Sequence, residues 1–176
     1  TDIIKTQSFI GFDKIVFNDS ILSAPPSTEL GFGAIAKGYG VDKVGQILRE
    51  NGINDFCISI GGENLARGSK PDNIPWMLQI NYPEKEKAIA KVPYCYFNLF
   101  DKGAATSGPY IQEQEINGKK YSHTINPLTG FPVPLTILSI TVLAESCIIA
   151  DGVATTMSVM TLPECKTFLQ QHPEYE

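Results

Sequence analysis

Apolar and polar residues alternate along the chain in short runs that predict strands, separated by a few stretches with helical spacing. Strands are expected at 12–17, 56–60, 76–82, 94–100 and 137–144. Apolar residues recur at helical spacing over 34–50, and helices are also expected over 145–160 and 163–171. The first helix should end at Asn51-Gly52, because glycine tolerates the left-handed conformation that often follows a helix.

Two further segments carry turn signals. The stretch 23–28 contains Pro25 and Pro26, which cannot donate to a strand ladder, so a loop is expected there. Asn117-Gly118 supplies the positive φ angles of a two-residue turn, which predicts a hairpin with arms near 111–116 and 120–125. Alternating strands and helices followed by hairpins favour an α+β fold over a doubly wound parallel sheet. The length of 176 residues is typical of one domain.

Composition narrows the class of partner. Apolar residues make up 43% and charged residues 19%, as in ordinary folded proteins. The net charge of −5 argues against nucleic acid, since phosphate binding needs a basic face. No apolar run approaches the roughly 18 residues of a membrane span. The four cysteines form no CxxC pair, which argues against a zinc site. They lie among apolar residues or in a helical pattern, which favours buried free thiols over disulfides.

A glycine-rich segment from Gly31 to Gly40 leads into the first predicted helix, with Lys37 one turn inside it. Backbone N–H groups at a helix N-terminus attract anions, and a lysine adds charge, so a phosphate or pyrophosphate would fit. The segment is neither a Walker A loop nor a convincing dinucleotide fingerprint. The alternative is a glycine-rich helix packed tightly against a sheet.

Two other glycine-containing segments could contact a ligand. Gly61-Gly62-Glu63 follows a predicted strand, where paired glycines allow close approach of the backbone and Glu63 could accept from a ribose or an amine. Between Gly103 and Tyr110, small hydroxyl residues could line a pocket or donate to a phosphate. Plain turns explain both segments equally simply.

Three polar residues are candidates for chemistry. His123 lies near the end of a predicted strand, before Asn126-Pro127. Histidine is a common general base, so His123 could serve as one or have a purely structural role. Asp151 and Thr155 are four residues apart and share one face of a predicted helix. A carboxylate and a hydroxyl are ligands that suit Mg²⁺, although a polar stripe would look the same.

The order of these segments is more specific than any one of them. Gly-Ala-Ile-Ala-Lys-Gly-Tyr-Gly-Val-Asp is followed by Ile-Gly-Gly-Glu, Ala-Thr-Ser-Gly, Ser-His-Thr-Ile-Asn-Pro-Leu-Thr-Gly and Ala-Asp-Gly-Val-Ala-Thr. From about residue 28 to residue 160 the chain resembles the ApbE family. Members of that family are FAD:protein FMN transferases, formerly labelled thiamine biosynthesis lipoproteins.

The resemblance implies a mixed or antiparallel sheet packed with helices, a set of ligand contacts and a metal site. The FAD site would include Lys37, Gly38, Gly61, Gly62, Glu63, Thr106, Ser107 and Gly108. The Mg²⁺ ligands would be the carbonyl of Ala34 and the side chains of Asp151 and Thr155, and His123 would be the base. FMN would then pass from FAD to a Ser or Thr hydroxyl of an acceptor protein, with release of AMP.

The resemblance also implies partners and a location. The acceptor would be a flavin-carrying subunit of a redox complex. The protein would be periplasmic, or anchored to the inner membrane through an N-terminal lipid that is absent from this chain. Alternatives are a non-catalytic FAD-binding module, an FAD pyrophosphatase of the same fold, and a part of a flavin-linked reductase. The last is disfavoured because no nicotinamide fingerprint occurs.

The chain departs from the family pattern in two positions and in length. Gly31 replaces an acid that usually precedes the Gly-Ala pair, and Asn126 replaces an acid after the histidine. Family members are roughly twice as long, so the chain is expected to be the larger, C-terminal part of such a protein, truncated at both ends.

Overall fold

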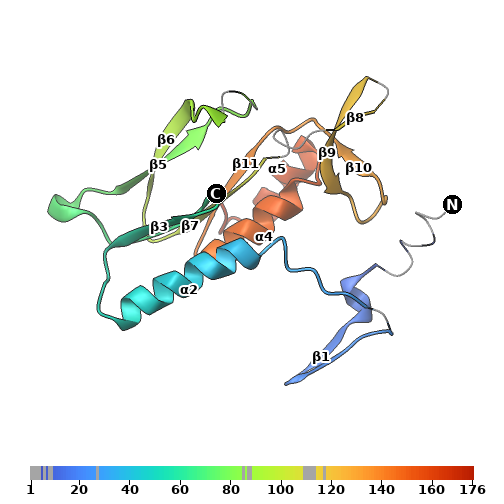
Figure 1. Ribbon diagram of the computed structural model, residues 1–176, viewed down its shortest axis with the longest axis horizontal. Coiled ribbons are helices and arrows are strands. Elements are labelled where there is room, and N and C mark those ends of the chain that lie inside the picture. The colour runs from blue at the N-terminus through green and yellow to red at the C-terminus, as the bar shows by residue number, and fades with distance from the viewer. Residues whose placement is uncertain are drawn as a thin grey trace.

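An antiparallel sheet of four strands forms the centre of the molecule (Figure 1). Its spatial order is β11 (Ile140–Ala144), β7 (Gly103–Ser107), β4 (Glu63–Arg67) and β3 (Phe56–Ile60). The computed structural model describes residues 5, 7, 10–26, 28–84, 86, 89–108, 114–116 and 118–176.

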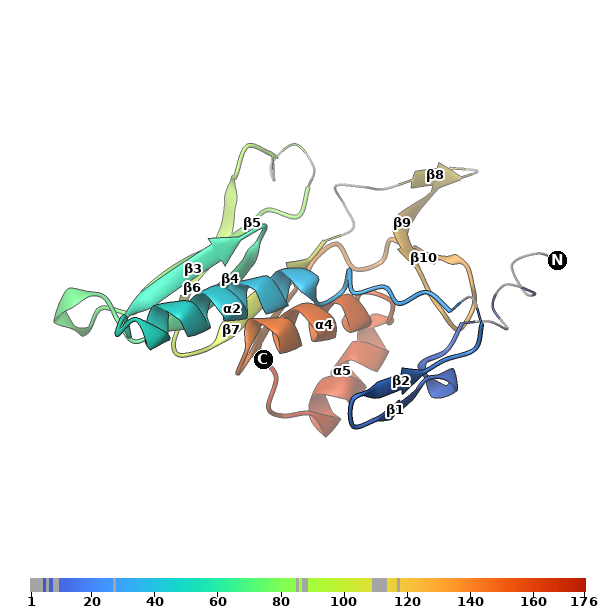
Figure 2. The same ribbon diagram turned by 60° about the horizontal axis from the view of Figure 1, so that its bottom comes forward.

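Two helices pack side by side on one face of this sheet, α2 (Ala36–Glu50) and α4 (Cys147–Met157) (Figure 2). A third helix, α5 (Leu162–Gln171), follows α4 and adds Cys165 and Phe168 to the same apolar layer. Alternate sheet residues point toward this layer, because successive side chains of a strand point to opposite faces. The buried residues on this side include Val41, Phe56, Leu65, Ala105, Val142, Ala144, Cys147, Ala150 and Ala154.

A two-stranded ribbon covers the other face of the sheet. It consists of β5 (Trp76–Asn81) and β6 (Pro93–Leu99), and a short 3-10 helix, Pro71–Asn73, precedes it. Its apolar side contacts the sheet through Trp76, Leu78, Phe97 and Leu99, which pack with Ala66, Ala104 and Leu143. The sheet is therefore covered on both faces, by helices on one side and by the ribbon on the other.

Two small elements extend from this body (Figures 1 and 2). One is a three-stranded sheet in the order β10 (Pro132–Pro134), β9 (Lys119–Ile125) and β8 (Gln114–Ile116). The other is the hairpin of β1 (Val16–Asn18) and β2 (Ile21–Ser23), preceded by a 3-10 helix at Phe12–Lys14. Large apolar side chains of this second element are exposed, and Phe12 is 84% exposed.

The expected α+β class is confirmed, and so are the positions of most elements. The strand over 56–60 has the predicted bounds, and β8 pairs with β9 as the predicted hairpin requires, with Ile116 opposite Lys119. Residues 111–113 and 117 of that prediction lie outside the described residues. Gly52 has a φ of +79° just after α2, as expected for a residue that follows a helix. Among the described residues, no helix combines the length and the apolar character needed to cross a membrane.

Several expectations were wrong. The strand expected over 12–17 begins as a 3-10 turn, closed by the Ile15 N–H to the Phe12 carbonyl, and only Val16 and Phe17 of that range are in β1. The first residue of the expected loop at 23–28, Ser23, is the last residue of β2. Cys95 is exposed on the ribbon, although burial was expected for it.

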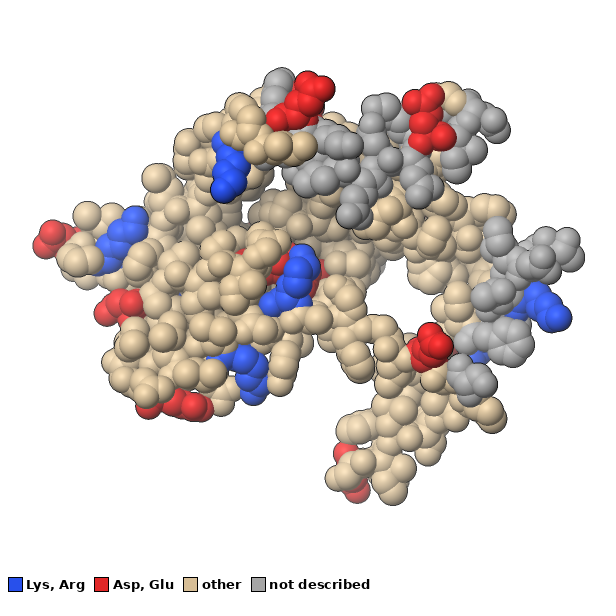
Figure 3. Space-filling model, in the orientation of Figure 1, with Lys and Arg blue, Asp and Glu red and all other residues tan. Residues whose placement is uncertain are grey.

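Charged side chains on the face shown in Figure 3 are scattered, and both signs occur close together. The described part of this face therefore presents no single basic surface for a polyanion. A local anion site would be built from individual cations and backbone N–H groups.

Candidate functional site

A cavity of about 430 Å³ lies where the end of β7, the start of α2, the middle of α4 and β9 meet. Four segments that are far apart in the sequence therefore contribute to one space. Its walls contain most of the residues singled out from the sequence: Ala34, Lys37, Thr106, Ser107, Gly108, His123, Asp151 and Thr155, together with Gly33 and Thr124. Gly38, Gly61, Gly62 and Glu63 are the four predicted site residues that do not line it.

A carboxylate on each of the helices α2 and α4 accepts hydrogen bonds from backbone N–H groups of the other helix. The side chain of Asp42 on α2 accepts the N–H groups of Cys147 and Ile148, at 2.9 and 2.8 Å. The Asp151 side chain on α4 accepts the N–H of Gly38 through Oδ2, at 2.9 Å. These bonds satisfy N–H donors that the first turn of a helix leaves without partners. They also fix Asp151 relative to the start of α2.

Gly38 contributes to the site by allowing this approach, although it does not line the cavity. A Cβ at Gly38 would lie 2.4 Å from the Cys147 carbonyl oxygen and 2.7 Å from Ile148 Cα. Only glycine therefore lets the two helices come this close. The alternative considered for this segment, tight packing of a glycine-rich helix, is correct for Gly38, while Ala34 and Lys37 face the cavity.

The role of Asp42 could not be read from the sequence. It caps a helix that begins 105 residues later in the chain, and the residue at the N-cap position, Ser146, makes no capping bond itself. Local spacing carries no signal for a cap supplied from another element. The only hint was the place of Asp42 at the end of the Gly-Ala-Ile-Ala-Lys-Gly motif.

Asp151 and Thr155 both line the cavity, one helical turn apart on α4. Asp151 is 5% exposed, and its Oδ2 is occupied by Gly38, which leaves Oδ1 as the oxygen for a ligand. No group of three or more His, Cys, Asp or Glu side chains that could hold a metal occurs among the described residues. One carboxylate and one hydroxyl suit Mg²⁺ when water and substrate phosphates complete the coordination, so these residues fit a metal that binds together with a phosphate ligand.

Lys37 lies between this cavity and a buried carboxylate. Its side chain is 50% exposed, and its Nζ donates to Oε1 of Glu63, which is 1% exposed. The second oxygen of Glu63, Oε2, is buried and has no hydrogen-bond partner among the described residues. Leaving such an oxygen unpaired costs about 1–3 kcal/mol. Burial raises the pKa of the Glu63 carboxyl, while the hydrogen bond and the charge of Lys37 act to lower it.

His123 is exposed on β9 and borders the cavity. Its neighbour Ser122 is 2% exposed and accepts the N–H of Thr124 through Oγ, at 2.9 Å. The alternation of strand side chains thus buries Ser122 and leaves the His123 imidazole exposed beside the cavity.

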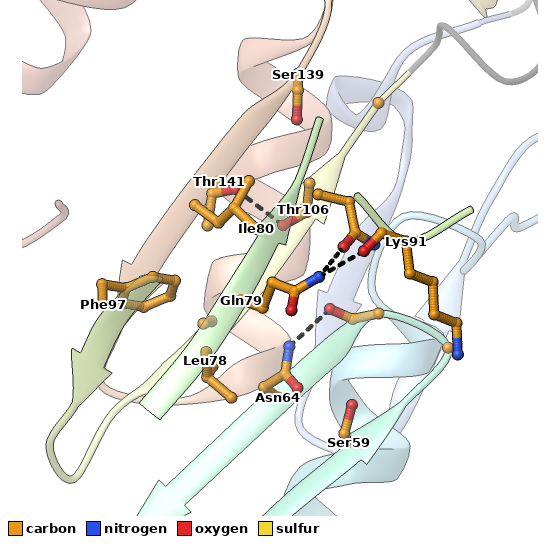
Figure 4. A pocket seen from close by; sticks show the side chains of 15 residues that line it. Ser59, Asn64, Leu78, Gln79, Ile80, Lys91, Phe97, Thr106, Ser139 and Thr141 are labelled. Atoms are coloured by element: carbon orange, nitrogen blue, oxygen red, sulfur yellow. Dashed lines mark hydrogen bonds between the residues drawn. The ribbon is translucent and has the colours of Figure 1, made fainter. Parts of the chain in front are cut away.

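A second cavity, of about 500 Å³, lies between the central sheet and the ribbon (Figure 4). Thr106 and Gly108 line both cavities, so the two spaces adjoin at the end of β7. Gly61 and Gly62 line this second cavity and not the first. Of the predicted glycine contacts, Gly61 and Gly62 therefore line only the second cavity, Gly108 lines both, and Gly38 lines neither.

Amide and hydroxyl groups line the second cavity. Gln79 Nε2 donates to Asn81 Oδ1 at 2.7 Å and to the Lys91 carbonyl at 3.0 Å, and Asn64 lies nearby on β4 (Figure 4). The hydroxyls of Thr106 and Thr141 are 2.9 Å apart. Asn64, Gln79, Asn81 and Thr141 were not among the residues predicted for the site. Polar residues at alternate positions of the predicted strand at 76–82 were the available signal.

The sequence model of the ApbE family matches residues 1–176, which is the whole chain. The chain belongs to the ApbE family. Two curated ApbE relatives are named FAD:protein FMN transferase. The one from Haemophilus influenzae is 34% identical over 165 residues, covering 90% of this chain and 46% of the relative. The one from Vibrio cholerae is 35% identical over 156 residues, covering 88% and 46%.

Solved ApbE structures have the same fold. The flavin transferase ApbE from Vibrio cholerae matches with a TM-score of 0.81 and 32% identity, over 97% of this chain and 53% of that one. The apo form of the Pseudomonas stutzeri flavinyl transferase ApbE matches with a TM-score of 0.85 and 30% identity, over 98% and 52%. The chain thus spans about half the length of the curated relatives that it matches.

Proposed function

We propose that this chain carries the transfer site of an FAD:protein FMN transferase, which moves FMN from FAD to a Ser or Thr hydroxyl of an acceptor flavoprotein and releases AMP. The observation that carries the proposal is the convergence of Lys37, His123, Asp151 and Thr155 on one cavity. Phosphoryl transfer uses a cation, a side chain that can accept a proton, and hard oxygen ligands for a metal ion.

In this proposal the side chains of Asp151 and Thr155 and the carbonyl of Ala34, which all line the cavity, would hold Mg²⁺. When bound, the ion would withdraw charge from the phosphorus and stabilise the departing AMP. Lys37 would bind a phosphate oxygen, since its side chain borders the cavity and is half exposed. The division of the lining between two adjoining cavities suits an elongated ligand such as a dinucleotide.

His123 would accept the proton of the acceptor hydroxyl. The hydroxyl oxygen then bonds to the phosphorus of the FMN half, and the bond from that phosphorus to the bridging oxygen breaks, so that AMP leaves. The exposure of His123 favours access by a protein substrate. The same exposure admits water, so hydrolysis of FAD to FMN and AMP is proposed as a side reaction when no acceptor is present.

The experiment mixes the intact protein with FAD, Mg²⁺ and a flavin-carrying acceptor, and measures AMP by chromatography and covalent flavin by fluorescence in a denaturing gel. Both products are expected. FAD binding without AMP would support a non-catalytic module instead, and AMP without covalent flavin would support a pyrophosphatase. Turnover that survives Asp151→Ala would remove the metal assignment. His123→Ala should abolish transfer at neutral pH and leave FAD binding intact.

A further inference from the structure

Glu63 has a position that contact with a ligand does not explain. It is the first residue of β4, and its strand neighbours alternate between the two faces of the sheet. Asn64 lines the second cavity on the ribbon side, whereas Leu65 packs with α2 on the helix side. Glu63 shares the face of Leu65, is 1% exposed and lines neither cavity.

The contacts of Glu63 point to Lys37. One carboxylate oxygen accepts from the Lys37 ammonium, and the other has no hydrogen-bond partner among the residues that the structure describes. A half-satisfied buried carboxylate opposes folding, and an apolar side chain of similar size would avoid that cost. Lys37 is half exposed and borders the first cavity. Glu63 therefore contacts the Lys37 ammonium from the protein interior, and a ligand would contact it from the cavity.

We propose that Glu63 is a positioning residue, which fixes the Lys37 ammonium at the wall of the first cavity so that it can bind the pyrophosphate of FAD. The inference rests on the proposed function for the identity of the ligand. A lysine side chain has four rotatable bonds, and an ammonium held in place before binding loses less freedom when the ligand arrives. Glu63 thus acts through Lys37 and not by touching FAD.

The pairing can be tested without FAD, by the rate at which an amine-acylating reagent modifies each lysine, followed by mass spectrometry. Lys43 is exposed on the same helix and serves as the internal reference. Glu63→Gln removes the charge with little change in volume, and we expect it to raise the labelling rate of Lys37 several-fold relative to Lys43. Glu29→Gln, an exposed change outside α2, should leave the ratio unchanged. An unchanged ratio in Glu63→Gln would overturn the pairing.

The link to the ligand is tested by a double-mutant cycle on FAD affinity in the intact protein. Glu63→Gln should weaken FAD binding by about tenfold, because a small displacement of a charged contact is costly. In the Lys37→Met background the same change should have no further effect on affinity. Equal weakening in both backgrounds would contradict the proposal. Failure of the wild-type protein to bind FAD would instead overturn the proposed function, and the labelling experiment would still decide the pairing.

Discussion

Asp42 and Asp151 lie on facing helices, and each accepts backbone N–H groups from the first turn of the other's helix. Asp42 caps α4 and Asp151 binds the N–H of Gly38 near the start of α2. The two carboxylates therefore set the position of α4 along α2. Because Asp151 is also a candidate metal ligand, the packing of the helices and the geometry of the site depend on the same contacts.

Replacing Gly38 by alanine should disrupt this contact. Its Cβ would lie 2.4 Å from the Cys147 carbonyl oxygen, so one helix must move. We expect Gly38→Ala to reduce the free energy of unfolding by about 1–3 kcal/mol, as overpacking usually does. Gly40→Ala is the matched control, since no atom of the described residues outside its own helix and chain neighbours lies within 4 Å of a Cβ there. In the interior of a helix this second change should stabilise by about 0.5–1 kcal/mol. Denaturant unfolding measures both, and equal effects would contradict the packing assigned to Gly38.

Removing the carboxylate of Asp42 should loosen the start of α4. Asp42→Ala leaves the N–H groups of Cys147 and Ile148 without their partner, and we expect a loss of about 1–2 kcal/mol in unfolding free energy. Asp42→Asn keeps one accepting oxygen and should cost less. Glu50→Ala on the same helix removes only an exposed contact with Gln46, worth about 0.2–0.5 kcal/mol. A loss in Asp42→Ala no larger than that of Glu50→Ala would show that the cap does not stabilise α4.

The capping box of α5 should make stability depend on pH. Glu164 Oε2 accepts the N–H of Thr161 at 2.6 Å, and this bond holds the pKa of the Glu164 carboxyl below its ordinary value. Because the folded-state pKa is depressed, the contribution is present above the unfolded-state pKa and is lost as pH falls through the folded-state pKa. The difference in Tm between wild type and Glu164→Ala should therefore be larger at pH 7 than at pH 3. For Lys166→Ala, on the same helix, the difference in Tm from wild type should not become smaller between pH 7 and pH 3. An equal difference in Tm between wild type and Glu164→Ala at both pH values would show that the charge of Glu164 does not stabilise the start of α5.

The thiols should differ sharply in reactivity. Cys95 is exposed, whereas burial and, to a smaller extent, nearby carboxylates including Asp42 raise the pKa of Cys147 to about 12. At pH 8 a maleimide should modify Cys95 in the folded protein and leave Cys147 unmodified, because the thiolate is the reactive form. Mass spectrometry after digestion identifies the modified residue. Rapid labelling of Cys147 under native conditions would contradict the packing of α4 against the sheet.

Some elements of the fold could be predicted from the sequence and others could not. Helix α2 and strand β3 were predictable, because each has regular spacing and a glycine signal at its end. Strand β7 was not recognised, since Gly103-Ala104-Ala105 lacks the large β-prone side chains that mark a strand. The structure supplies the reason: a Cβ at Gly103 would lie 2.4 Å from the Cys147 nitrogen, so α4 crosses the sheet too closely for larger residues.

The motif order indicated several residues that the fold brings to one cavity, but it did not indicate the contacts that hold them there. The motif order indicated Lys37, Asp151 and Thr155, and the fold brings them to one cavity. The sequence did not reveal that Glu63 lies beneath Lys37, nor that Asp42 caps α4, because both contacts join residues far apart in the chain. Such pairings depend on how elements pack, which local spacing does not encode.

The most direct test of the central claim is a crystal of the intact protein grown with FAD and Mn²⁺, which gives an anomalous signal in place of Mg²⁺. We expect one anomalous peak in the first cavity, between the Asp151 carboxylate, the Thr155 hydroxyl and the pyrophosphate of FAD. The peak should be absent from Asp151→Ala crystals grown in the same way. FAD bound with its pyrophosphate away from these two side chains, or a peak that persists in Asp151→Ala, would contradict the assignment of this cavity as the transfer site.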